Sequence, residues 1–229
     1  MEGVRVIGFD ADDTLWLNDS YFREAEMRFC ALMAPYASRE ETSKLLYAIE
    51  VANLDLYGYG AKSYLLSLIE TAIQIGRSSL SSQTVSEILD IGRWLIERPV
   101  VLVEGAREVL EQLQANYLLL LVTKGDLLDQ ERKLKASGLQ PLFHHIEILS
   151  NKEEADYLQL FARLQIEPRE FLMVGNSLRS DVIPPVSLGA KAVHIPHDTV
   201  WQHEAEHSGA SGYSFSSLLS IAELPALLM

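Results

Sequence analysis

The sequence predicts a doubly wound α/β fold, in which helices cover both faces of a parallel sheet, together with an all-helical cap domain. After Pro99, short apolar runs alternate with helical patterns, and a long helical block over residues 18–97 precedes this alternation. Strands of a covered parallel sheet are apolar throughout because both of their faces are buried. We therefore expect a catalytic α/β core at 1–16 and 99–229, and a helical cap at 17–98.

The first predicted strand, Val4–Phe9, is a short apolar segment that runs directly into acidic residues. Runs of this kind, too short for a typical helix, are consistent with buried strands. Further strands are expected at 117–122, 145–149, 171–174 and 190–195.

Apolar residues recur at helical spacing within the block, as at Leu65 and Leu68. Tyr57–Gly60 contains two glycines and is expected to be a loop. Ser150 and Glu153 have the spacing of a capping box, which predicts a helix starting near Glu153. Core helices are expected at 106–115, 127–136, 153–164, 182–188 and 216–228.

The composition narrows the range of partners. The chain has 229 residues and a formal net charge of -13, which argues against nucleic acid and anionic membranes as partners. No apolar run approaches the roughly 18 residues of a membrane span. The single cysteine, Cys30, excludes an intrachain disulfide and is expected to be a buried apolar residue. We expect a cytoplasmic protein, and the sequence gives no indication of its oligomeric state.

Polar residues follow four of the predicted strands. They are Asp10-Ala11-Asp12-Asp13-Thr14, Thr123-Lys124-Gly125-Asp126, Ser150-Asn151-Lys152 and Gly175-Asn176-Ser177-Leu178-Arg179-Ser180-Asp181. Ligands of open parallel sheets bind at the carboxyl ends of the strands. We therefore expect the four clusters to meet at one edge of the sheet.

These residue types indicate phosphoryl chemistry. Asp10 and Asp181 offer carboxylate oxygens to Mg²⁺, which would shield a phosphate from an attacking carboxylate. Asp10 is the candidate nucleophile, and Asp12 can protonate the leaving oxygen and later deprotonate water. Thr123 can bind phosphoryl oxygens, and Lys152 can neutralise the transferring group.

The clusters resemble the motifs of the haloacid dehalogenase superfamily, in its phosphatase branch with a helical cap. The first motif matches Asp10–Leu15, the second Thr123, the third Lys152 and the fourth Gly175–Asp181. The resemblance implies a Mg²⁺-dependent hydrolase of a small phosphorylated metabolite that works through a phospho-Asp10 intermediate. It also implies a metal site at Asp10, Asp181, Asn176 and the backbone carbonyl of Asp12.

Two positions depart from the family pattern. Asp13 stands where glycine is usual, so this carboxylate either tunes metal binding or caps a turn. Asn176 stands where aspartate is common, and it still offers an oxygen but no charge. Asp181 is therefore expected to be the stronger metal ligand.

Candidate substrate-binding residues are Tyr59 and Lys62 of the cap loop and Lys124 beside Thr123. Tyr59 can equally be a packed residue of an interhelical turn, and Lys124 can face solvent instead.

Two other kinds of metal site are disfavoured. A calcium loop starting at Asp10 would need glycine and glutamate where Leu15 and Tyr21 stand. His194, His197, His203 and His207 lack the spacing of a zinc site.

Rival functions differ in the residues that they need. A metal-free dehalogenase of the superfamily would lack a carboxylate at Asp12, and a binding module would be expected to lack one of the four clusters. A phosphomutase would share every motif and stays an alternative.

Overall fold

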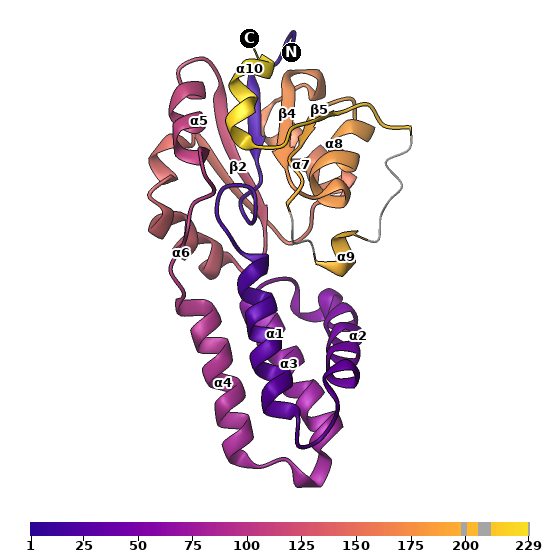
Figure 1. The fold of residues 1–229 in the computed structure, drawn as a ribbon. Coiled ribbons are helices and arrows are strands. Elements are labelled where there is room, and N and C mark those ends of the chain that lie inside the picture. Colours follow the sequence, from indigo (N-terminus) through magenta and orange to yellow (C-terminus); the bar gives the residue numbers. More distant parts are fainter. Residues whose placement is uncertain (198–200, 206–211, 229) are drawn as a thin grey trace. The chain divides into compact units, whose positions relative to one another are not determined.

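The computed structural model describes residues 1–197, 201–205 and 212–228 (Figure 1). The chain divides into two compact units. The first contains Met1–Asp19, Val100–Lys124 and Gln130–Met229, and the second contains Ser20–Pro99 with Gly125–Asp129. The assignment of the second unit as a cap stays a prediction.

A six-stranded sheet forms the centre of the first unit, in the order β3-β2-β1-β4-β5-β6. Every neighbouring pair in this sheet is parallel. The strands are β1 Val6–Phe9, β2 Leu118–Lys124, β3 His145–Leu149, β4 Phe171–Gly175, β5 Lys191–His194 and β6 Ser216–Ser217. The predicted parallel α/β core is confirmed.

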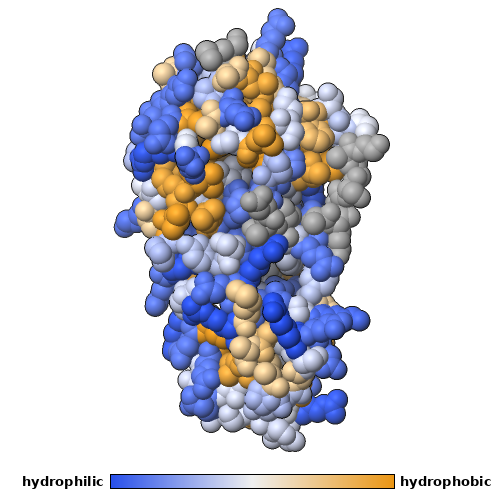
Figure 2. Space-filling view, viewed as in Figure 1, coloured by the Kyte–Doolittle hydropathy of each residue, from blue (hydrophilic) through white to orange (hydrophobic). Residues whose placement is uncertain are grey.

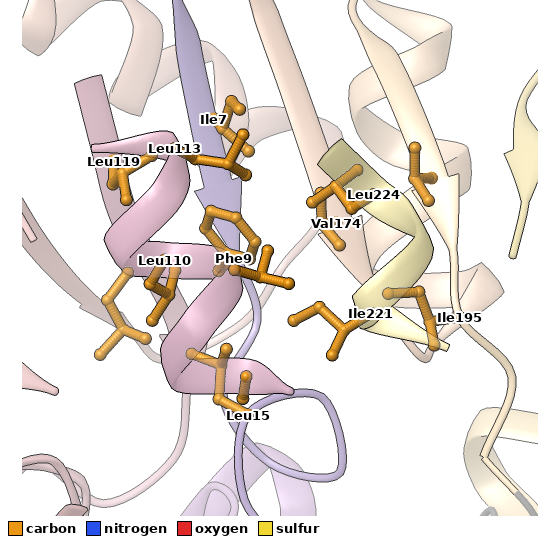
Figure 3. Close-up of a cluster of buried hydrophobic side chains, with 14 of the residues drawn as sticks. Ile7, Phe9, Leu15, Leu110, Leu113, Leu119, Val174, Ile195, Ile221 and Leu224 are labelled. Atoms are coloured by element: carbon orange, nitrogen blue, oxygen red, sulfur yellow. The ribbon is translucent and has the colours of Figure 1, made fainter. Parts of the chain in front are cut away.

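Alternate residues of the strands pack on opposite faces of this sheet, as the period of two in a strand requires. On one face, residues such as Phe9, Leu121 and Val174 pack with Leu110 and Leu224 (Figure 3). The opposite face has its own buried cluster. It contains Val6, Leu120, Val122, Tyr157, Leu160, Phe161, Phe171, Met173 and Ala190.

The helices described in the first unit are α5 Ala106–Leu113, α7 Glu154–Leu164, α8 Ile183–Ser187, α9 Gln202–Ala205 and α10 Leu224–Leu228. Of these, α5 and α10 contribute buried side chains to the first cluster, and α7 contributes them to the second. Helix α6, Leu127–Ser137, begins in the segment assigned to the second unit and continues in the first. A π-helical turn, Leu178–Val182, follows β4. Helices therefore cover both faces of the sheet, which is the doubly wound arrangement.

Four helices build the second unit around a separate apolar cluster. They are α1 Asp19–Met33, α2 Arg39–Tyr57, α3 Ala61–Gly76 and α4 Ser82–Glu97. Phe29, Leu46, Leu68 and Ile88 each contribute a buried side chain from a different helix. The predicted loop between Tyr57 and Ala61 is present.

Several local predictions are wrong. The expected helix 216–228 is instead the edge strand β6, a 3₁₀ turn at Ile221–Glu223 and the short α10. The expected helix 182–188 begins earlier, as a π turn, because the Ser177 side chain caps the backbone N–H of Ser180. The capping box of α7 uses Glu153 and Asp156, not Ser150 and Glu153.

Most of the displayed surface is hydrophilic, with apolar residues in smaller areas (Figure 2). No helix in the described part of the chain combines the length and the apolarity needed to cross a membrane. Cys30 is buried and free, as expected.

Candidate active site

Three of the predicted residues meet around one buried ammonium group. The Lys152 Nζ donates to Asp10 Oδ1 and, at 2.8 Å, to Asp181 Oδ1. All three side chains are buried, with Lys152 only 2% exposed. Asp10 directly follows β1, and its backbone N–H donates to the Val174 carbonyl of β4 at 2.9 Å. The adjacent central strands therefore fix where the carboxylate stands.

The electrostatics of this group follow from burial and from its unequal charges. Burial raises the pKa of Asp10 to about 7; Lys152 opposes the shift and Asp181 adds to it. The two carboxylates raise the pKa of Lys152 against the effect of burial, so the ammonium stays charged. When both carboxylates are ionised, the group of Asp10, Lys152 and Asp181 carries a net charge of one negative unit.

Gly175 makes room for Asp181. A Cβ on Gly175 would collide with the Asp181 carboxylate. The same carboxylate accepts the backbone N–H of Ser177 at 3.0 Å. The fourth motif therefore needs glycine here because the aspartate folds back over the end of β4.

Oxygen atoms suited to a hard cation lie beside Asp10. The Thr14 hydroxyl is 3.2 Å from Asp10 Oδ2 and 3.4 Å from Asn176 Oδ1, so it lies within hydrogen-bond distance of both oxygens. Within the described residues, no group of three or more His, Cys, Asp or Glu side chains could hold a metal. Mg²⁺ commonly takes only one or two carboxylates and completes its shell with other oxygens and water. Asp10, Asp181 and Asn176 therefore fit Mg²⁺ better than they fit zinc.

Asp12 is held by three side chains of the first unit. Lys133 Nζ donates to its two carboxylate oxygens at 2.6 and 2.8 Å. Trp16 Nε1 donates to Oδ1 at 2.7 Å, and Gln130 Nε2 donates to Oδ2 at 3.0 Å. Although burial opposes it, Lys133 lowers the pKa of Asp12, with help from these other donors. These donors therefore favour the ionised form of the Asp12 carboxylate.

Thr123 lies buried at the end of β2. Its Oγ1 accepts a hydrogen bond from Gln130 Nε2 at 3.2 Å. The hydroxyl therefore keeps its own proton for donation to another oxygen.

Lys124 does not face solvent. Its Nζ lies 2.5 Å from Glu204 Oε1 of α9 and 2.9 Å from Ser180 Oγ. The interpretation of Lys124 as a solvent-facing residue is wrong, because a buried carboxylate draws it inward.

The cap-loop candidates lie in the second unit. Lys62 pairs there with Asp126, whose Oδ1 is 3.0 Å from Nζ. Tyr59 is partly buried in the α2–α3 loop. Their role in substrate binding stays a prediction.

Asp13 caps a helix. It adopts a left-handed backbone with a φ of 61°, and its carboxylate accepts the backbone N–H groups of Asn18 and Asp19. These donors lie at the start of α1, so the turn-capping interpretation describes what the side chain does here.

The histidines do not gather into a metal site within the described residues. His194 Nε2 lies 3.0 Å from the Asn176 carbonyl, and His203 Nε2 lies 2.7 Å from Arg179 Nη1. His197 is 4.0 Å from Asp13 Oδ1. His207 lies outside the described residues.

Sequence reasoning missed Gln130, Lys133 and Glu204. Gln130, Lys133 and Leu134 share one face of α6 at helical spacing, and all three are buried. Polar residues in line with a core leucine were a usable signal for the first two. Glu204 lies on the four-residue helix α9, which offered no such pattern.

Comparison with known proteins shows to which family the chain belongs. Residues 4–188 match the haloacid dehalogenase-like hydrolases. The chain belongs to this family. A solved haloacid dehalogenase-like hydrolase from Xanthomonas campestris is 34% identical, with a TM-score of 0.88 over 99% of this chain and 91% of that one. The predicted family and the prediction of a hydrolytic enzyme are confirmed.

The chain is also similar to two further proteins. The N-acylneuraminate-9-phosphatase of Mus musculus is 27% identical, over 98% of this chain and 94% of its own length. The putative hydrolase YfnB of Bacillus subtilis, solved with bound magnesium, is 18% identical, with a TM-score of 0.68 over 99% of each chain. At this identity, YfnB supports the fold alone.

Proposed function

We propose that this haloacid dehalogenase-like hydrolase is a Mg²⁺-dependent, cytoplasmic phosphatase of a small phosphorylated metabolite. The observation that carries the proposal is the buried Asp10–Lys152–Asp181 group at the carboxyl end of the sheet. A nucleophilic carboxylate held by a permanent cation suits attack on phosphorus. The phosphatase relatives, at 26–27% identity, support the same reaction class.

Asp10 is the proposed nucleophile. Its carboxylate oxygen forms a bond to phosphorus as the bond from phosphorus to the leaving oxygen breaks, giving an aspartyl phosphate and an alcohol. Lys152 keeps Asp10 oriented, and the Thr123 hydroxyl donates to a phosphoryl oxygen.

Asp12 is the proposed acid and base. A protonated Asp12 gives its proton to the leaving oxygen, and the resulting carboxylate then takes a proton from water as the water attacks the phosphoryl group. Phosphate leaves and Asp10 is regenerated. The ionised form that Lys133 maintains is the one needed for the second step.

Mg²⁺ would be held by Asp10, Asp181, Asn176 and the backbone carbonyl of Asp12. When bound, it supplies positive charge that lowers the repulsion between a phosphate and a carboxylate.

The deciding experiment measures phosphate release from a panel of phosphomonoesters, with Mg²⁺ and with EDTA. The panel covers sugar phosphates, nucleotides and phosphorylated acids. We expect Mg²⁺-dependent release by the wild type and at least a thousandfold loss in Asp10→Asn. Release that persists in Asp10→Asn would contradict the nucleophile, and no release from any ester would contradict the phosphatase.

A further inference from the structure

A carboxylate of the chain itself, that of Glu204, is held by a cluster of side-chain donors. Three side-chain donors converge on the Glu204 carboxylate. Lys124 Nζ reaches Oε1 at 2.5 Å, Ser180 Oγ reaches Oε2 at 2.9 Å, and Ser177 Oγ also donates to Oε2. Lys124 donates to Ser180 as well, which ties two of the donors to each other.

The position of this carboxylate is connected to the proposed phosphoryl site through hydrogen bonds. Ser177 donates its side chain to Glu204 and its backbone N–H to Asp181. Asp181 in turn bonds Lys152, which bonds Asp10. A short chain of hydrogen bonds therefore links the Glu204 carboxylate to the nucleophile.

The donors form a built site instead of a loose surface contact. The side chains of Lys124 and Glu204 are only 16% and 12% exposed, and Ser180 is buried. Despite burial, Lys124 first and then the two serines lower the pKa of Glu204 to about 2. The position therefore prefers a carboxylate in its ionised form.

The three donors and the Glu204 carboxylate that they bind belong to different parts of the fold. Lys124 ends β2, and both serines belong to the turn after β4, so the sheet holds all three donors. Glu204 lies on α9, a four-residue helix. Another carboxylate could accept the same hydrogen bonds while Glu204 turned to water, so exchange of one for the other would lose few interactions.

We propose that Lys124, Ser177 and Ser180 form a substrate subsite for a carboxylate, and that Glu204 occupies it in the absence of substrate. The preferred substrate would then be a phosphomonoester that also carries a carboxylate, a conclusion that rests on the proposed phosphatase function. Glu204 acts as an internal competitor, so it weakens the binding of carboxylated ligands and leaves simple phosphate esters unaffected.

The test measures binding, so it does not depend on turnover. Phosphonoacetate carries a phosphonate and a carboxylate, methylphosphonate lacks the carboxylate, and neither contains a phosphate ester bond. Dissociation constants for both are measured by calorimetry in Mg²⁺ buffer. The proteins are the full-length wild type, Glu204→Gln, Lys124→Met and the control Glu167→Gln, which changes an exposed glutamate.

We expect Glu204→Gln to bind phosphonoacetate about tenfold more tightly and methylphosphonate within about twofold of the wild type. Lys124→Met should lose the preference for phosphonoacetate, and Glu167→Gln should match the wild type. Equal shifts for both ligands, no shift, or no phosphonoacetate binding by Glu204→Gln would each overturn the subsite. A chain that shows the expected binding but releases no phosphate would retain the subsite and refute the phosphatase.

Discussion

Lys133 donates hydrogen bonds to both carboxylate oxygens of Asp12, and its own side chain is almost completely buried. A lysine in this position fixes the direction of the carboxylate more firmly than a single bond would. Trp16 and Gln130 add one bond to each oxygen. Asp12 is therefore positioned by groups that themselves take no part in bond breaking.

Lys133→Met should reduce kcat for an alkyl phosphate about 10- to 100-fold, because Asp12 loses its orientation as proton donor. For 2,4-dinitrophenyl phosphate, whose leaving group needs no proton, the loss should stay within about threefold. Lys133→Arg should recover part of the alkyl phosphate activity. Lys135→Met, an exposed change on the same helix, is the control. Equal losses for the two esters would refute a positioning role.

Lys152→Met should lower the free energy of unfolding by about 3–5 kcal/mol, because it leaves Asp10 and Asp181 buried without their cation. Urea denaturation at pH 7 in EDTA measures this, again with Lys135→Met as the reference. A stability equal to that of the wild type would show that the two carboxylates do not need the ammonium.

Gly8→Ala should destabilise the fold by about 1–3 kcal/mol. A Cβ on this residue of the central strand would collide with the ring of Phe171 and lie 3.1 Å from Met173 Sδ. The double variant Gly8→Ala/Phe171→Leu should recover part of the loss, because leucine leaves space where the ring stood. Additive losses in thermal or urea unfolding would exclude this steric cause.

Glu50→Gln should stabilise the protein increasingly as the pH rises. Burial, with a contribution from Glu26, raises the pKa of Glu50 from 4.5 to about 8. The folded state therefore binds this proton more tightly than the unfolded chain, and wild-type stability falls between pH 4.5 and 8.

The gain from Glu50→Gln should be near zero below pH 4.5, then grow to about 1–3 kcal/mol and level off above pH 8. Urea denaturation from pH 4 to pH 9 measures it. Asp55→Asn, an exposed change on the same helix, is the control. A gain that does not change with pH would contradict the assignment.

The predictable part of this molecule is the part in which burial dictates residue type. The strands β1, β2 and β4 are mainly apolar because helices cover both faces of the sheet, whereas β3 and β5 also contain polar residues such as Glu147 and Lys191. All five lie where the sequence predicts strands. The strand β6 consists of two serines that pair with Val193 and His194 at the edge. A strand that only adds to an existing edge needs no apolar residues, so β6 has no hydrophobic pattern. The sequence therefore predicted a helix over this segment.

The candidate site also has a part that could be predicted from the sequence and a part that could not. Asp10, Lys152 and Asp181 each follow a strand, so the topology alone brought them to one place. Lys133 and Glu204 reach the site from helices, and only the fold decides which helical residues turn inward. The sequence therefore identified the candidate catalytic residues at the strand ends. It did not identify the helical residues that hold them in position.

The central place of β1 has a consequence for how the chain is made. This strand is synthesised first, yet its partners are Leu118–Leu121 on one side and Phe171–Val174 on the other. During translation, β1 therefore waits unpaired while α1 to α4, whose contacts are local, can already assemble. The nucleophile reaches its final environment only when the ribosome has released the segment around Asp181, so a chain that ends before Asp181 holds no assembled catalytic group.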